Sequence, residues 1–265
     1  MPRSMVFGSL ILLVLGVASA APVPAETPWV TVRGRVVWPE KVAVPPNRPI
    51  NLVGAPDAMY ALRGGPIFED KVLVAPKGRG LKNVVVSLRL DNQDRKAAFP
   101  VERIHPDFKG AKPTNHVVKS EFCRYDRRIL PVREGDAIEF RNNQPVVDNI
   151  QFSSGEFQSN RVQLAGSSWT TDPVTGFLGS FNSSIHHWMK GYIRVFDHPY
   201  FAITDADGFF EIPKAPTGKW RIQYWHELGY HKGAAGRFGF PIEIKDEGRG
   251  TKGVATLEYE NPTLP

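Results

Sequence analysis

Short runs of apolar residues, separated by Gly, Pro, Asn and Asp, follow one another along most of the chain. Hardly any segment sustains the three-and-four spacing of apolar residues that is typical of a helix. β-Branched and aromatic residues dominate the runs, as is usual in strands. The runs that predict strands are 30–37, 72–74, 84–90, 129–131, 137–141, 192–196, 209–212, 220–225, 240–244 and 254–259. The pattern therefore predicts an all-β protein.

Pro- and Gly-rich stretches at 39–66 and 99–112 predict irregular connections between these strands. Long loops that offer surface for a partner are expected at 42–66, 99–119 and 153–179. The Asp205-Ala206-Asp207-Gly208 stretch lacks the spaced acidic ligands and closing Glu of a calcium loop, so it predicts a tight hairpin turn.

The first residues read as an export signal. Arg3 precedes an apolar run over 5–17, and Ala18-Ser19-Ala20 supplies small residues for cleavage. We therefore expect residues 1–20 to be removed as a signal peptide. The mature protein is then expected to have no transmembrane segment and to reside in the periplasm or at the cell surface. A retained N-terminal anchor is the alternative, although no charged flank follows the run.

Charge and cysteine content limit the candidate classes. The formal charge of +6 is a modest excess that suits anionic polymers or an acidic surface. Nucleic acid is excluded as a partner, because no recognition helix or stacking motif accompanies the four arginines between 124 and 133. The single cysteine, Cys123, cannot form an intramolecular disulfide and is expected as a buried residue of a strand, with a reactive thiol as the alternative.

Two segments resemble bacterial cupredoxin-like proteins. Residues 130–142 (LPVREGDAIEFRN) are similar to the strand, turn glycine and strand of that family, and 183–189 (SSIHHWM) are similar to its C-x-x-H-P-W-M region. The resemblance implies a Greek-key β-sandwich, plastocyanin-like, over residues 99–197.

A third stretch resembles a carboxypeptidase regulatory-like module, which is a transthyretin-like β-sandwich. The matching segments are 204–212 (TDADGFFEI), 215–220 (APTGKW) and 224–227 (YWHE), and 32–37 and 81–88 fit the earlier half of that module. The resemblance implies a discontinuous domain of 28–98 plus 198–260, into which the cupredoxin-like domain is inserted.

The cupredoxin resemblance also implies a copper site, but a degenerate one. It places His186 and Met189 at the second His and the Met of the family, Ser183 at the Cys, and Asp148 at the first His. A serine hydroxyl cannot replace the thiolate of a blue-copper set, so no cofactor is expected and copper is disfavoured. Cys123 is expected to point into the sandwich, away from His186. A site of Asp148, His186 and His187 for Cu(II) or Zn(II) stays open.

The sequence contains no nucleophile elbow, phosphate-binding loop or zinc-protease motif, so we expect a protein that is not an enzyme. His226, Glu227 and His231 are expected to fix a strand end or a loop. The leading hypothesis is a binding or structural module whose partner is a protein or a glycan. Copper handling or electron transfer is one alternative. Carbohydrate binding is the other, with stacking faces offered by Trp29, Trp38, Trp169 and Trp220.

Overall fold

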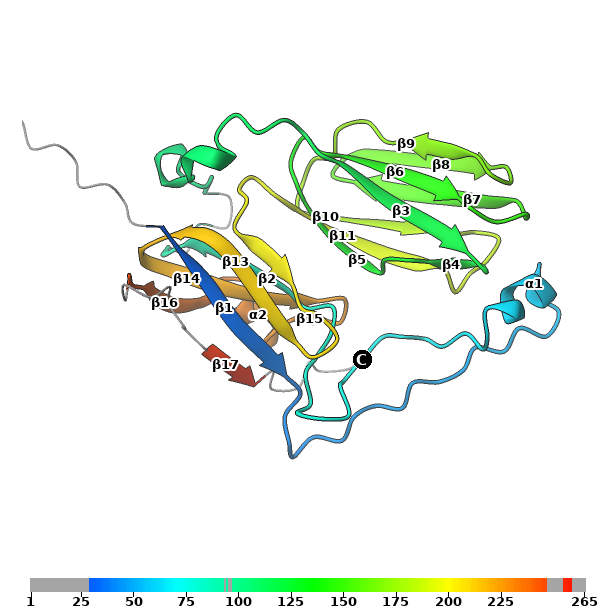
Figure 1. Cartoon of the computed structure of the whole chain (residues 1–265), viewed down its shortest axis with the longest axis horizontal. Helices are drawn as coiled ribbons and strands as arrows, with labels where there is room; N and C mark the ends of the chain where they lie inside the picture. The colour runs from blue at the N-terminus through cyan, green and yellow to red at the C-terminus, as the bar shows by residue number, and fades with distance from the viewer. Residues whose placement is uncertain (1–28, 93, 95–96, 247–254, 259–265) are drawn as a thin grey trace, which may run out of the picture.

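The computed structural model (Figure 1) describes residues 29–92, 94, 97–246 and 255–258, and strands are the main regular secondary structure in this part of the chain. The all-β prediction is confirmed. The strands form two neighbouring sandwiches, and helices are limited to short turns. No helix within the described ranges is long and apolar enough to cross a membrane. The predicted signal peptide lies outside the described residues.

One sandwich, the inserted sandwich, consists of the consecutive strands β3–β11. Its two sheets have the orders β5-β11-β10-β7-β8 and β4-β3-β6-β9. The strands are β3 (Asn115–Glu121), β4 (Arg124–Tyr125), β5 (Ile129–Arg133), β6 (Ala137–Asn142), β7 (Asp148–Ser154), β8 (Phe157–Gln163), β9 (Ser168–Thr170), β10 (Leu178–Asn182) and β11 (Lys190–Phe196).

Alternation along β6 explains how the two sheets close on a core. Ile138 and Phe140 are buried, while Glu139 and Arg141 lie on the other face and form an ion pair. The core also contains Val118, Leu130, Val132, Ile150, Phe152, Val174, Phe181, Ile193 and Val195. Each sheet contains one parallel pair, β3 with β6 in one and β5 with β11 in the other.

The other sandwich, the split sandwich, draws its strands from both sides of the inserted one. They are β1 (Trp29–Val37), β2 (Val85–Leu90), β12 (Phe201–Ile203), β13 (Phe209–Pro216), β14 (Gly218–His226), β15 (Gly229–Tyr230), β16 (Phe240–Ile244) and β17 (Ala255–Glu258). β1 pairs with β13 and β2 pairs with β14, the strand pairing that an insertion requires. The boundaries 28–98, 99–197 and 198–260, and the transthyretin-like kinship, stay predictions.

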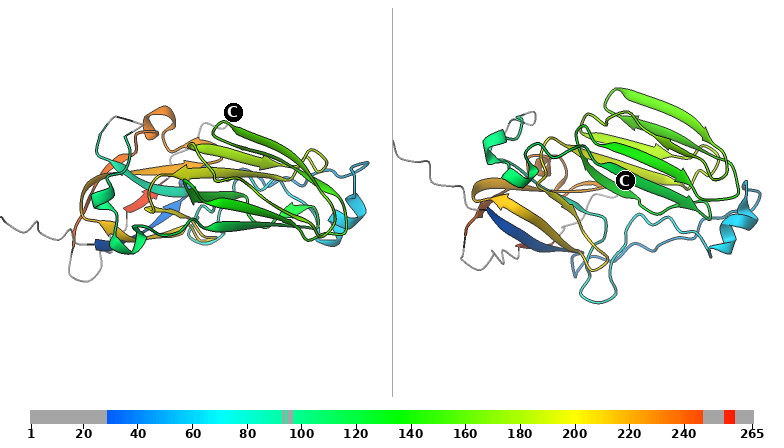
Figure 2. Two further views of the ribbon diagram at one scale, coloured as in Figure 1. Left: turned by 90° about the horizontal axis from the view of Figure 1, so that it is seen from above. Right: turned by 45° about the horizontal axis from the view of Figure 1, so that its top comes forward.

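A long connection joins β1 to β2 and reaches the far end of the inserted sandwich. It carries helix α1 (Ala58–Arg63) close to β4 (Figure 1), and the views of Figure 2 place α1 at the same end. The Arg124 guanidinium holds it there by donating to the carbonyls of Ala61, Gly65 and Pro66. The remaining helical turns are η1 (Val101–Arg103), η2 (Pro106–Phe108) and α2 (Gly233–Gly236).

The two sandwiches contact each other through an apolar cluster. Its buried members are Val85, Ile129, Phe196 and Trp225. Beside it, Arg128 forms a bidentate ion pair with Glu227, with N–O distances of 2.9–3.0 Å. This pair confirms that Glu227 fixes a strand end.

Several local expectations were wrong. Residues 153–179 are not a loop, because they contain β8 and β9, and the expected loop 99–119 includes most of β3. The polar sequence FQSNRVQ of β8 follows from its place at a sheet edge, where most of its side chains face solvent. Residues 72–74 form only an isolated bridge between Val74 and Leu81.

The Asp205–Gly208 turn is confirmed, but it is not a hairpin, because β12 pairs with β2 and β13 pairs with β1 in a different sheet. The Asp205 carboxylate accepts the backbone N–H groups of Asp207 and Phe209, and Gly208 has a φ of 82°.

Candidate functional site

The residues that the copper pattern selected meet at the end of the inserted sandwich that α1 covers. Asp148 begins β7, and Ser183, His186 and Met189 lie in the loop between β10 and β11. All four side chains are buried. The sequence therefore predicted their proximity correctly, although not how they contact one another.

Ser183 organises this loop through hydrogen bonds. Its hydroxyl donates to Asp148 Oδ1 at 2.5 Å and accepts the N–H groups of Ile185 and His186 at 3.1 and 2.8 Å. The Ser183 N–H donates to the Met189 carbonyl at 3.0 Å, and the Met189 N–H donates to the His186 carbonyl at 2.8 Å. The hydroxyl thus serves as a local cap that closes residues 183–189 into a tight loop.

His186 lies between two carboxylates. Its Nδ1 is 3.1 Å from Asp148 Oδ1 and its Nε2 is 3.1 Å from Asp57 Oδ2, so both ring nitrogens face acceptors. Burial lowers the pKa of His186, but hydrogen bonds to Asp148, to the Cys123 thiol and to Asp57 outweigh this effect and raise the pKa to about 10. An imidazolium that donates from both nitrogens accounts for the geometry.

Asp57 reaches this site from the long connection. It directly precedes α1 in a left-handed conformation with φ 54°, and its side chain is 34% exposed. Nothing in the sequence signalled its role, because it lies 129 residues from His186.

Cys123 also belongs to the site, which corrects the expectation that it would sit on a strand and point away from His186. Phe122 and Cys123 have φ values of 49° and 52°, so they form the primed turn between β3 and β4. The thiol lies next to the His186 ring and packs in one apolar cluster with Met189. The Cys123 backbone is fixed as well, since its N–H donates to Gln144 Oε1 and its carbonyl accepts Trp188 Nε1, each at 2.8 Å.

The copper set that the resemblance implies does not fit these residues. A blue-copper ion needs a thiolate and two imidazoles around one point, whereas Ser183, Asp148 and His186 are already hydrogen-bonded to one another. Asp148 Oδ2 is buried without a hydrogen-bond partner among the described residues. His187, the third residue of the Cu(II) or Zn(II) site expected with Asp148 and His186, is exposed and does not join them. Within the described ranges, no three His, Cys, Asp or Glu side chains are placed to hold a metal ion.

The other aromatic and titratable candidates have structural surroundings. Trp38 and Trp220 are buried in the core of the split sandwich and offer no face to a sugar. Trp29 packs edge-on against His105, and Trp169 stacks on Phe140. These contacts disfavour the stacking surface expected from the tryptophans.

Comparison with known proteins gave matches to solved structures only. No family model and no curated protein matches the chain. A copper-containing nitrite reductase from Thermus scotoductus SA-01 matches over 32% of this chain and 23% of its own, at 18% identity and a TM-score of 0.30. This chain thus spans less than a quarter of that enzyme.

Smaller copper proteins match as well. A copper(I) form of an amicyanin variant matches over 31% of this chain and 81% of its own, at 18% identity and a TM-score of 0.28. A purple cupredoxin from Nitrosopumilus maritimus matches over 30% of this chain and 98% of its own, at 17% identity and a TM-score of 0.26. The similarity is therefore to cupredoxin β-sandwiches, partial in coverage and weak in score.

Proposed function

We propose that this chain is an exported, non-enzymatic protein with a cupredoxin-like sandwich that binds a partner and in which hydrogen bonds replace the copper ion. One observation carries the proposal: the side chains at three of the four ligand positions, Ser183, Asp148 and His186, are hydrogen-bonded to one another. The fourth, Met189, is packed in an apolar cluster. A buried group that is hydrogen-bonded in this way stabilises the loop without an ion.

Copper loading tests the proposal. The mature protein, incubated with Cu(II) and dialysed, is expected to retain far less than stoichiometric copper and to show no intense visible charge-transfer band, because Ser183 offers no thiolate. Metal analysis and absorption spectroscopy give the result. Stoichiometric copper with a strong visible band would contradict it.

A paired variant tests whether the loss of copper is chemical. Asp148→His with Ser183→Cys is expected to gain copper and a visible band, since His186 and Met189 already flank the restored positions. Asp148→Asn with Ser183→Ala is the matched control without new ligands. A folded, colourless Asp148→His, Ser183→Cys protein would show that these four positions do not form one ligand set.

Copper handling is the second candidate function, and Cys123 is the observation that favours it. Its thiol, the Met189 thioether and the His186 ring meet at one site, and thiolate and thioether ligands suit Cu(I). Titration with Cu(I) under reducing conditions separates this candidate from the first. Tight binding that Cys123→Ser abolishes would support it, and equal binding by that variant would eliminate it.

Export has its own test. N-terminal sequencing of the protein from its native host is expected to begin at Ala21, because small residues precede this position. A chain that keeps Met1 and sediments with membranes would contradict export by cleavage.

A further inference from the structure

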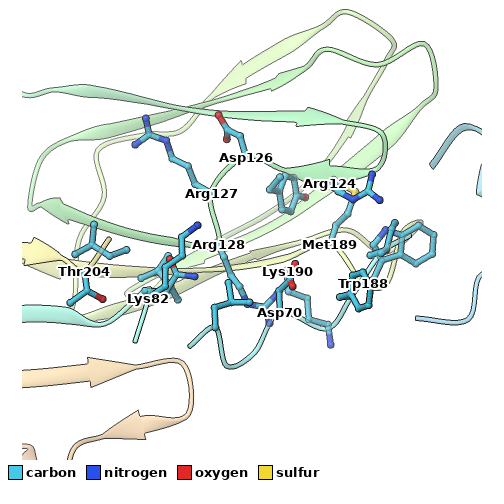
Figure 3. A pocket seen from close by; sticks show the side chains of 17 residues that line it. Asp70, Lys82, Arg124, Asp126, Arg127, Arg128, Trp188, Met189, Lys190 and Thr204 are labelled. Carbon is cyan, nitrogen blue, oxygen red and sulfur yellow. The ribbon is translucent and has the colours of Figure 1, made fainter. Parts of the chain in front are cut away.

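A cleft of about 380 Å³ opens next to the candidate site, where three parts of the chain meet. The long connection contributes Phe68, Asp70 and Lys82, and Thr204 follows β12 of the split sandwich. The inserted sandwich contributes most of the remaining wall, including Trp188 and Lys190 (Figure 3). A volume of this size suits a small ligand or a short segment of a polymer.

Basic side chains outnumber acidic ones around the cleft. Five basic residues line it: Lys82, Arg124, Arg127, Arg128 and Lys190. Two of them have partners, since Arg124 donates to backbone carbonyls and Arg128 is paired with Glu227. Within the part of the chain that the structure describes, Lys82, Arg127 and Lys190 are exposed and form no ion pair.

The two acidic residues of the cleft are held in local contacts. Asp126 accepts the Lys119 N–H at 2.9 Å, and Asp70 accepts the Asn47 side-chain amide at 2.7 Å. Neither carboxylate pairs with the three available cations. The cleft therefore presents three positively charged side chains that form no ion pair with any described group of the protein.

Aromatic rings lie beside these cations. Trp188 is partly buried and its indole is fixed by the hydrogen bond from Nε1 to the Cys123 carbonyl. Phe68 is 38% exposed. A fixed ring binds a ligand face without losing rotamer freedom, and such rings suit the apolar face of a sugar.

We propose that the cleft binds an acidic oligosaccharide, whose carboxylate or sulfate groups pair with Lys82, Arg127 and Lys190 while a sugar ring packs against Phe68 or Trp188. This rests on the binding role proposed above and names the class of its ligand. Lys82 lies at the end of the long connection, just before β2, whereas Arg127 and Lys190 belong to the inserted sandwich, so the three cations suit anionic groups held at fixed spacing on a stiff chain. An acidic peptide would have to order each of its flexible side chains.

Titration calorimetry with four probes tests the proposal. The mature protein is expected to bind an oligogalacturonate or a heparin-derived tetrasaccharide, more weakly as salt rises, and to ignore a neutral cello-oligosaccharide. The two acidic probes distinguish carboxylate from sulfate recognition. Polyglutamate tests the peptide alternative, and equal affinity for it would overturn the glycan assignment.

Charge-removing variants locate the site. Lys82→Gln, Arg127→Gln and Lys190→Gln combined should weaken acidic-glycan binding at least about tenfold. Lys41→Gln, Lys77→Gln and Lys109→Gln combined remove the same charge from exposed positions outside the cleft and should change affinity much less. Phe68→Ala tests the ring contact.

Two results would overturn the proposal. One is that neither acidic probe binds, and the other is that both triple variants lose the same amount of affinity for the acidic glycan. If the protein instead captured a neutral glycan or a protein, this inference would fail while the binding role proposed above would stand.

Discussion

His186 is a buried imidazolium whose charge is balanced by Asp148 on one side and Asp57 on the other. Removing one acceptor leaves a buried N–H group of His186 without a partner. The free energy of unfolding then falls by more than the intact hydrogen bond contributes to it. Asp57 is partly exposed, so water screens its share of the interaction.

Stability is expected to fall at alkaline pH because of this residue. The folded-state pKa of His186, about 10, lies above the ordinary value of about 6.5, so its contribution is complete below pH 6.5 and is lost as pH rises toward 10. Urea unfolding at pH 6, 8 and 10 (about two-unit steps) measures this loss. His186→Gln should flatten the decline, and Asp57→Asn should destabilise by on the order of 1 kcal/mol near neutral pH. An identical decline in His186→Gln would contradict the assignment.

The cupredoxin resemblance placed Asp148, Ser183, His186 and Met189 together because the motifs around them align with the four ligand positions of that family. It misplaced Cys123 because the Phe122-Cys123 pair occupies a primed turn that usually takes Gly, Asn or Asp. It missed Asp57 because that contact depends on how the long connection is routed. Local patterns carry no information about such a route.

At the scale of elements, the long connection is held by hydrogen bonds more than by its own secondary structure. α1 has only six residues and no side-chain cap, so it is too short to be stable alone. Arg124 supplies the missing order by bridging the carbonyls of Ala61 and Gly65 to the β3–β4 turn.

Replacing this clamp should loosen the connection selectively. Arg124→Met is expected to speed amide exchange over 58–69 and to lower stability by about 1 kcal/mol, because partly buried carbonyls lose a charged donor. Exchange within β6 should not change. Arg127→Met is the control, since among the described residues the hydrogen bonds to this segment come from Arg124 and not from the neighbouring Arg127. Equal exchange in the two variants would show that other contacts hold the connection.

The strand pattern was clearest in the sequence where one face of a strand is buried, as in β1 and β6. It failed for β8, which is polar along most of its length. Period-two alternation disappears when neither face is covered by another layer, so no sequence signal distinguished this edge strand from a loop.

At the scale of the whole molecule, the Arg128–Glu227 pair joins the two sandwiches. The Glu227 side chain is 2% exposed, and burial raises its pKa although Arg128 opposes that shift. The carboxylate therefore depends chiefly on Arg128 for its charge.

A double-mutant cycle should reveal that dependence. Arg128→Met is expected to cost about 3–5 kcal/mol because it leaves an unpaired buried carboxylate, while Arg128→Met with Glu227→Gln should recover part of the loss. Urea unfolding of the four proteins gives the coupling energy. Additive effects would mean that the pair contributes nothing to the contact between the sandwiches.

Acid should destabilise the split sandwich through two buried histidines. Burial lowers the pKa of His198 and of His226 to about 4, below the ordinary value of about 6.5. Their neutral forms therefore stabilise the protein above pH 6.5, and this contribution is lost as pH falls toward 4. Thermal unfolding between pH 7 and 4 (about three units) should show a shallower decline in His226→Asn than in the wild type. An unchanged decline in both His226→Asn and His198→Gln would refute this source of acid sensitivity.

The pairing of β1 with β13 has a consequence for the order of folding. Arg33 and Glu211, which face each other in this ladder, are 178 residues apart. During synthesis β1 therefore waits for its partner until almost the whole chain has emerged, whereas β3–β11 already have one another. β2 and β12, which flank the inserted sandwich, pair directly through Ser87 and Phe201. Completion of the inserted sandwich thus brings the two halves of the split sandwich together and shortens the loop that β1 must close. Formation of the inserted sandwich should therefore precede and accelerate the pairing of β1 with β13, the slowest step of refolding.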